Sequence, residues 1–496
     1  PYIVLDQIYE PAEEEFDVET VALYFAGCTE DLEADEISVT DETLPDYLIK
    51  ELADRQSLRL SLWPKRYRPS GWVKVQNTET NIMDPLMQVK ISIGRNVFWR
   101  YTYTDNNGYF SAPKKYRGKV RIRAKWRGYT ATIRKTWNEI LGLWVSDHLM
   151  TITRGNNNIT KNIMHGEPHT GIFGIDLQGG HLWFKGTVHN GLRKYIDFCN
   201  SNGISHTVGN ANVWAFAKGK DASTPMLYKY PQLASMSTLA NVGQANFWSV
   251  LTNVISGVAI NLVPAHLRPD QIFGGLNNKK VSYDTRANTI RIHQVVFHES
   301  GHYSHASKAG SSYWANVFAS EISNHISYSD SYYNGSAPSF TAAKRIAVAE
   351  GWGNFTEFKI TTFYYGKSYV TPQTNITQMY STTGTNSFME QFNVYDTPMS
   401  VTRTDDHSWF LHGIMWDLVD NAVDNAVMRH RDGNGNPLNA INDQVFLSTS
   451  NPNSLAPIFN ALNSGVTSAA TLKTTLQSSW PAQSANINNL FASYGY

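Results

Sequence analysis

Two histidines and a glutamate stand at a spacing that suits metal chemistry. His298 and His302 are four residues apart, so on a helix both imidazole rings lie on one face and can direct a nitrogen at the same ion. Glu299 follows the first histidine directly and can reach a water molecule held by that ion. Two imidazoles with a carboxylate base beside them are the parts of hydrolytic zinc chemistry. This segment therefore predicts a zinc site with a general base.

A zinc site that keeps one position open needs a third protein ligand, and two glutamates compete for this role. Glu321 follows His302 after 18 intervening residues, the spacing seen in aminopeptidase N-like enzymes, and Glu350 follows it after 47. The neighbours of Glu350 read Ala-Glu-Gly-Trp-Gly-Asn-Phe-Thr-Glu over residues 349–357. This stretch closely resembles the Asn-Glu-Gly-Phe-Ala-x-Tyr-x-Glu helix that supplies the third zinc ligand in the same enzymes, and it favours Glu350.

Together with the His-Glu-x-x-His motif, this stretch makes residues 280–430 similar to the gluzincin clan of zinc metallopeptidases. The resemblance implies that Glu350 joins the two histidines as the third zinc ligand and that Glu299 acts as general base. It also implies that Asn354, four residues beyond Glu350, orients a ligating histidine through a hydrogen bond. Ala349 replaces the Asn of the clan's aminopeptidases and the insert before Glu350 is longer, so their specificity is not carried over.

Further histidines lie close to this motif or downstream of it. The segment 405–418 resembles the downstream helix that carries a transition-state histidine in thermolysin-like enzymes. That resemblance implies His407 as the residue that stabilises the oxyanion, with His412 and Tyr395 as alternatives. His305 also falls on the ligand face of the motif helix, where we expect it to be packed rather than bound to metal.

Earlier in the chain, an alternating pattern predicts strands. Between about residues 71 and 133 apolar and polar residues alternate, as in Val-Arg-Ile-Arg-Ala-Lys over residues 120–125. Asp105-Asn106-Asn107-Gly108 predicts a tight turn. With Asp84-Pro85-Leu86 and the run Thr104–Phe110, the pattern resembles the transthyretin-like or carboxypeptidase-regulatory-like β-sandwich over about 65 residues. This resemblance implies an accessory module on a secreted or surface protein, and it implies no activity.

These patterns predict a multidomain chain. We expect an acidic segment of uncertain fold at residues 1–64, an all-β sandwich accessory module at 65–140, and a zinc metallopeptidase domain at 141–496. The last domain is expected to be a large α+β domain of zincin type with a mostly helical C-terminal part. Helices are expected at residues 190–199, around Val295, at 347–358 and at 410–427.

Three finer expectations concern the surroundings of the motif. Residues 288–292, upstream of it, are expected to form an edge strand. Gly301 lies inside the motif helix, where glycine costs roughly 1 kcal/mol relative to alanine, so we expect another backbone to approach it closely. Trp352 is expected to line the cleft.

Composition excludes several classes of protein. The chain has 496 residues, 42% of them hydrophobic and 12% aromatic, which rules out a disordered chain. No apolar run approaches the roughly 20 residues of a membrane span, and two cysteines cannot build a cysteine-based zinc site. A net charge of zero and the lack of a recognised module disfavour nucleic acid as a partner. Because the chain begins at Pro1, we expect any targeting segment to be absent from it.

The zero net charge hides an uneven distribution. Residues 1–60 hold 17 acidic and three basic residues, a net charge of −14, whereas residues 65–135 hold 17 basic and three acidic residues. Two interpretations remain open. The two regions form independently solvated surfaces, or the acidic segment docks on the basic module under the guidance of complementary fields.

The sequence as a whole predicts a secreted or surface-exposed zinc metallopeptidase that hydrolyses protein or peptide substrates. One alternative is a binding or adhesion protein that keeps zinc for structure only, and the presence of Glu299 argues against it. A second alternative is a peptidase selective for glycosylated or cell-wall peptides. The sequence sets neither side-chain specificity nor the choice between internal and terminal cleavage.

Overall fold

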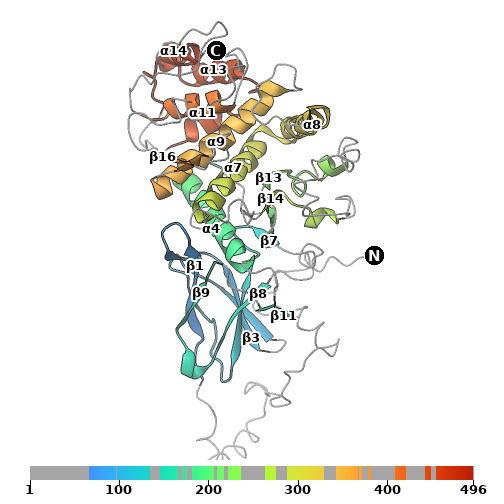
Figure 1. Cartoon of the computed structure of the whole chain (residues 1–496), viewed down its shortest axis with the longest axis vertical. Helices are drawn as coiled ribbons and strands as arrows, with labels where there is room; N and C mark the ends of the chain where they lie inside the picture. The colour runs from blue at the N-terminus through green and yellow to red at the C-terminus, as the bar shows by residue number, and fades with distance from the viewer. Residues whose placement is uncertain are drawn as a thin grey trace, which may run out of the picture.

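The molecule has a strand-rich N-terminal region with several sheets and a helical C-terminal region, at opposite ends of its long axis (Figure 1). The computed structural model describes residues 66–95, 98–134, 146–165, 170–171, 174–175, 181–205, 209, 211–216, 222–235, 263–274, 288–328, 342–366, 368–370, 378–380, 408–420, 442–447, 454–494 and 496. The acidic segment expected at residues 1–64 lies outside these ranges. The strand-rich region therefore precedes the helical region along the chain, as the sequence predicts.

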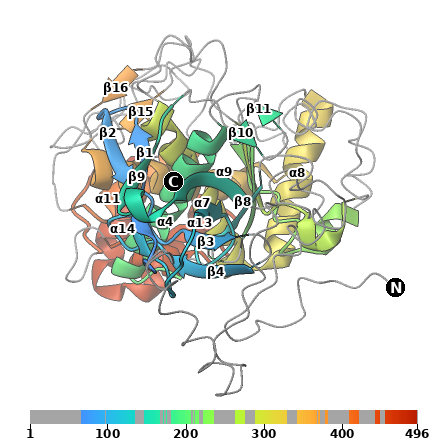
Figure 2. The ribbon, with the colours of Figure 1, turned by 90° about the horizontal axis from the view of Figure 1, so that it is seen from below.

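Two four-stranded sheets form the strand-rich region. In the first, β1 (Ser70–Asn77) pairs antiparallel with β2 (Ile82–Pro85) and β5 (Tyr109–Ser111) and in parallel with β9 (Ile159–Ile163). The second has the order β4-β3-β6-β8, formed by β3 (Lys90–Arg95), β4 (Phe98–Tyr103), β6 (Val120–Lys125) and β8 (Ser146–Ile152). Figure 2 views the molecule from below, from the end where these strands lie.

The predicted strands and turn are both present. Ile91, Ile93 and Ile122 are fully buried, so one side of the second sheet faces the core, but Ser92 and Arg123 on the other side are also buried, so burial does not follow the alternation strictly. In the turn, the Asp105 carboxylate accepts hydrogen bonds from the backbone N–H groups of Asn107 and Tyr109. Gly108 completes the turn with a φ of 74°, a left-handed conformation that favours glycine. Local side-chain chemistry is therefore enough to fix this connection.

Strand pairing crosses the boundary expected at residue 140. Strands β8 and β9 follow that residue, yet they complete the two sheets of the strand-rich region. Conversely, β7 (Thr132–Arg134) pairs in parallel with β12 (Asn212–Phe216), which pairs in parallel with β14 (Gln271–Gly274). The edge of this third sheet is β13 (Ala222–Ser223), antiparallel to β14. Strands on each side of residue 140 thus pair with strands on the other side, and the two regions share one hydrophobic core.

The helical region is built around three long helices that lie side by side, α4 (His181–Ser201), α7 (Asn288–Ala309) and α9 (Ala343–Tyr365) (Figure 1). Further helices are α8 (Ser311–Tyr328), α11 (Ser408–Asp417), α12 (Ala456–Ala461), α13 (Ala469–Ser479) and α14 (Ser484–Ser493). Short pairs are β10 (Thr170–Gly171) with β11 (Gly174–Ile175), and β15 (Ser368–Val370) with β16 (Gln378–Tyr380). No helix among the described residues is long and apolar enough to cross a membrane.

Several of the predicted helices are confirmed. Residues 190–199 lie within α4, Val295 within α7 and residues 347–358 within α9. The helix expected at 410–427 is present as α11, which ends at Asp417, and residues 421–427 lie outside the described ranges.

The edge strand expected at residues 288–292 is wrong, because α7 already begins at Asn288. The turn after β1 supports this helix start: the Thr289 N–H donates to Thr78 Oγ1 at 3.1 Å, and the Thr78 N–H donates to Thr289 Oγ1 at 2.9 Å. A free helix N-terminus leaves its first N–H groups without partners, and here the strand-rich region supplies one. The apolar residues Ile290 and Ile292 are two positions apart, as in a strand, but both are buried because this end of the helix is covered on more than one side.

Candidate metal centre

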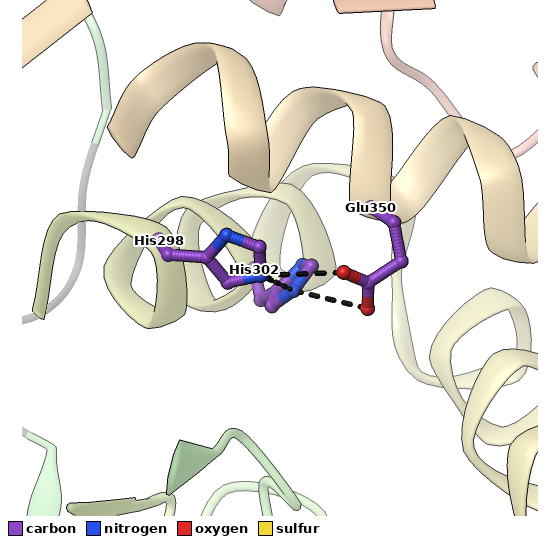
Figure 3. A group of neighbouring side chains, drawn as sticks. All are labelled: His298, His302 and Glu350. Atoms are coloured by element: carbon purple, nitrogen blue, oxygen red, sulfur yellow. Dashed lines mark hydrogen bonds and ion pairs between the residues drawn. The ribbon is translucent and has the colours of Figure 1, made fainter. Parts of the chain in front are cut away.

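Two helices bring three potential metal ligands together. His298 and His302 project from α7 toward Glu350 on α9 (Figure 3). Their Nε2 atoms are 2.9 Å apart, His298 Nε2 is 3.2 Å from Glu350 Oε2, and His302 Nε2 is 3.3 Å from Glu350 Oε1. The predicted common face of the two histidines is therefore present. Of the two competing glutamates, Glu350 is the one that joins them.

These separations match the size of a metal ion. Zinc binds nitrogen and oxygen ligands at about 2.0–2.1 Å, and two ligands at tetrahedral positions are then about 3.3 Å apart. The three observed edges are 2.9, 3.2 and 3.3 Å. The two distances to Glu350 end on different oxygens, so its carboxylate spans the two rings. The His298, His302 and Glu350 group can hold a metal ion.

Two glycines allow α7 and α9 to approach this closely. A Cβ atom on Gly301 would lie 2.3 Å from Thr356 Oγ1, which confirms the predicted close approach at this residue. A Cβ atom on Gly353 would lie 2.8 Å from His302 Cε1 and 3.0 Å from His298 Nε2. The backbone of α9 therefore forms one wall of the centre, against which both rings rest.

Trp352 does not line a cleft, contrary to the prediction. Its side chain is fully buried, and its indole Nε1 donates a hydrogen bond to the carbonyl of Gly301 at 3.1 Å. The ring packs near Phe355 and Phe459. Through this hydrogen bond, Trp352 on α9 helps to hold the two helices together.

A second carboxylate, that of Glu357, orients His298. Nδ1 of His298 lies 3.2 Å from Glu357 Oε2, and Gln294 Nε2 donates to the other oxygen of Glu357 at 2.8 Å. An Nδ1–H donated to a carboxylate leaves Nε2 as the lone-pair donor toward a metal. The sequence assigned this role to Asn354. Since α7 and α9 run antiparallel, the side of His298 turned toward the start of α7 faces a later turn of α9, where Glu357 lies.

The charges of the centre favour a cation. Burial lowers the pKa of His298, but hydrogen bonds to Glu350 and Glu357 outweigh it and hold the pKa well above its ordinary value. Burial raises the pKa of Glu350, but His302 and His298 outweigh it and hold the pKa below its ordinary value. Positive charge is therefore stabilised among these carboxylates despite their burial.

The carboxylate of Glu299 is held beside this group. Its side chain is buried, and its Oε2 accepts a hydrogen bond from Thr224 Oγ1 at 2.7 Å. Burial raises the pKa of Glu299, although His298 and His302 oppose that rise. Thr224 follows edge strand β13, and its carbonyl accepts a hydrogen bond from Trp314 Nε1 at 3.3 Å. The sequence carries no local signal for Thr224, because it meets Glu299 only through the packing of β13 against α7.

The other predicted residues do not join the metal ligands. Burial and the negative charges of Glu350 and Glu299 raise the pKa of Glu321 well above its ordinary value, yet Glu321 does not belong to the three-ligand group. His305 is fully buried against Tyr313, with its pKa lowered by burial to about 3, so its predicted packed role is confirmed. His412 is buried against Phe358. His407 and Tyr395 lie outside the described residues.

Comparisons of the chain with protein-family models, with curated proteins and with solved structures give no match. Its function is therefore inferred from the geometry and chemistry of this centre.

Proposed function

We propose that the protein is a zinc-dependent metallopeptidase of gluzincin type that hydrolyses peptide bonds. One observation carries this proposal: a buried carboxylate, Glu299, is fixed beside two imidazoles and a carboxylate that lie at metal-binding distances from one another. A purely structural metal site has no need of a base next to it. Hydrolysis by an activated water molecule needs both a metal ion and a base.

The donor set supports zinc as the metal. Two imidazole nitrogens and one carboxylate oxygen are a ligand set of catalytic zinc, which keeps its fourth position for water or substrate. His298 and His302 would bind through Nε2, and Glu350 through its carboxylate. When bound, zinc supplies a Lewis acid that polarises the substrate carbonyl and lowers the pKa of water.

The residues of the chain then have separate tasks. Because Thr224 holds Oε2 of Glu299, Oε1 is left to take a proton from the water molecule that attacks the peptide carbonyl. Glu299 subsequently returns this proton to the nitrogen of the leaving amine. Glu357 holds the tautomer of His298 throughout. His407 as the donor to the oxyanion remains a prediction from sequence.

We also propose that the strand-rich region is an accessory β-sandwich and that the protein acts outside the cell or at its surface. Support for the sandwich comes from two four-stranded sheets with a common buried core and from the Asp105–Gly108 turn between their strands. Support for the location comes from the resemblance of the sequence to modules of secreted and surface proteins.

The test combines zinc content with hydrolysis of a mixed peptide library by three proteins. The unmodified chain should bind one zinc ion and cleave peptides. Glu299→Gln should retain zinc and lose about 10²- to 10⁴-fold in kcat, the usual contribution of general acid–base catalysis. Glu350→Ala should lose zinc.

Each other outcome contradicts a definite part of the proposal. Activity that survives Glu299→Gln means that Glu299 is not the base. An unmodified chain that binds zinc but cleaves no peptide identifies the alternative, a binding protein with a structural metal. A chain that binds no zinc contradicts the centre itself.

A further inference from the structure

Glu321 is a carboxylate near the metal centre that the mechanism above does not use. It lies on α8, seven residues after Trp314, so the two side chains share one face of that helix, two turns apart. The Trp314 ring packs against the His302 ring with 5.6 Å between their centres. Helix α8 itself packs against both α7 and α9 (Figure 1). The face of α8 that carries Glu321 is therefore turned toward the centre.

The charges of the centre act on Glu321, although it is not a member of the ligand group. Burial raises the pKa of Glu321, and the negative charges of Glu350 and Glu299 raise it further. His298 opposes this rise. Part of the Glu321 side chain is nevertheless exposed to solvent. Glu321 is thus an accessible carboxylate beside the centre.

The chain supplies no cation to this carboxylate. Among the residues that the structure describes, Glu321 makes neither a hydrogen bond nor an ion pair. The carboxylate of Glu299 is held by Thr224, and those of Glu350 and Glu357 are held by histidines. These three carboxylates already exceed the two positive charges of a zinc ion, so bound zinc leaves Glu321 uncompensated. A carboxylate that loses part of its hydration without gaining a partner is unfavourable.

We propose that Glu321 is a specificity-determining residue that binds a positively charged amino group of the substrate. This proposal rests on the proposed peptidase function. An ammonium group would give Glu321 the charge-assisted hydrogen bond that the described part of the chain does not provide. It would also reduce the excess of negative charge around the centre. A peptide carries this group at a free amino terminus or on a lysine side chain, and both present the same chemistry to a carboxylate.

A carboxylate placed for an ammonium group also discriminates against substrates that lack one. An uncharged peptide in the same position would remove water from Glu321 without pairing it, and an unpaired buried group is costly. Sites built for a polar group reject analogues without it for this reason. We therefore expect cationic peptides to be preferred about tenfold or more over uncharged peptides of the same shape.

The first experiment measures kcat/KM for matched sets of peptides. The amino terminus is free or acetylated, and the residue on either side of the cleaved bond is lysine or its uncharged analogue norleucine. One of the two charges should raise kcat/KM about tenfold or more. A preference for the free terminus identifies the terminal amine as the bound group, and a preference for lysine identifies a side-chain subsite.

Two variants assign this preference to one carboxylate. Glu321→Gln has nearly the same shape, and it should retain zinc but lose the preference. Asp197→Asn is the matched control, because it removes a carboxylate that already pairs with Arg193 on α4, and it should keep the preference. No preference in the unmodified chain, or one that survives in Glu321→Gln, overturns the proposal. Loss of zinc from Glu321→Gln also overturns it, because Glu321 would then be a metal ligand.

The second experiment measures binding instead of cleavage, which separates this proposal from the proposed function. Calorimetry compares the same peptides on Glu299→Gln and on Glu299→Gln combined with Glu321→Gln. Cationic peptides should bind about tenfold or more tightly than uncharged ones to the first protein, and equally tightly to the second. This result, with no cleavage by the unmodified chain, supports the role of Glu321 and contradicts the peptidase. Cleavage by the unmodified chain, with equal binding of charged and uncharged peptides to Glu299→Gln, supports the peptidase and overturns the role of Glu321.

Discussion

The contact between Gly353 and the two histidines gives a sharp prediction for Gly353→Ala. The added Cβ atom would lie 2.8 Å from His302 Cε1 and 3.0 Å from both Cε1 and Nε2 of His298. Ordinary van der Waals contact begins near 3.4 Å, so the His302 ring has to move by about 0.6 Å and the His298 ring by about 0.4 Å. Metal sites tolerate changes of about 0.2 Å in ligand distance. The coordination geometry therefore cannot absorb this methyl group.

The expected loss falls on metal binding rather than on folding. Displaced ligands should weaken zinc binding by about 10- to 100-fold, equivalent to about 1.4–2.7 kcal/mol. Alanine gains about 1 kcal/mol over glycine inside a helix, which offsets part of the crowding in the metal-free protein. Competition with a chromophoric chelator measures the zinc affinity, and thermal unfolding with and without zinc measures how much the metal stabilises each protein.

Gly191→Ala is the matched control. Its Cβ atom would lie 3.0 Å from His293 Cδ2 and 3.1 Å from Val296 Cγ1, so it crowds α7 equally without touching a ligand. We expect this variant to be less stable and to bind zinc with unchanged affinity. If Gly353→Ala binds zinc as tightly as the unmodified chain, the claim that α9 sets the position of the rings is refuted.

Three other predictions follow from the groups around the centre. Thr224→Val should lower kcat at least tenfold, with zinc content and KM nearly unchanged. Thr224→Ser keeps the hydroxyl and should retain the activity. Equal kcat values for both variants would show that Thr224 takes no part in the mechanism. Glu357→Gln should weaken zinc binding about tenfold in a chelator titration, because the charge that orients His298 is lost; unchanged affinity would contradict this role. Burial lowers the pKa of His189 to about 4, so the unfolded chain, with a pKa near 6.5, binds the proton first on acidification. The free energy of unfolding should fall by about 3 kcal/mol from this residue between pH 7 and pH 4, and urea titrations of His189→Gln should show a correspondingly weaker pH dependence.

The sequence predicted those parts of the centre that depend on local spacing. Residues four apart share a helix face, so the placement of His298 and His302 follows from the helix itself. Gly301 indicated close packing because glycine is costly inside a helix unless something needs its space. For Glu350 no spacing rule sufficed, and the resemblance of its neighbours to a known ligand helix was needed.

The parts that failed depend on contacts between distant segments. Thr224 and Glu357 meet Glu299 and His298 across 75 and 59 residues, and nothing in their own neighbourhoods indicates these partners. The role of Asn354 was implied by the resemblance, which places it four residues beyond Glu350, whereas the antiparallel course of α7 decides which turn of α9 faces His298.

The error at residues 288–292 has a related cause. Two isoleucines separated by one residue are compatible with a strand, but also with a helix end that is buried on several sides. In the same way, β7, β8 and β9 pair with strands on the other side of the expected boundary. Alternation within a strand does not specify which distant strand it pairs with.

The central claim is that His298, His302 and Glu350 bind one zinc ion and leave it a position for water. X-ray absorption spectroscopy of the zinc-loaded protein tests this claim most directly. It should show two imidazole ligands and further oxygen ligands at about 2.0–2.2 Å, with one imidazole lost in His302→Ala and a new inhibitor-derived ligand when a hydroxamate is added. A zinc ion with four protein ligands that a hydroxamate leaves unchanged, or a spectrum that His302→Ala does not alter, would contradict the claim.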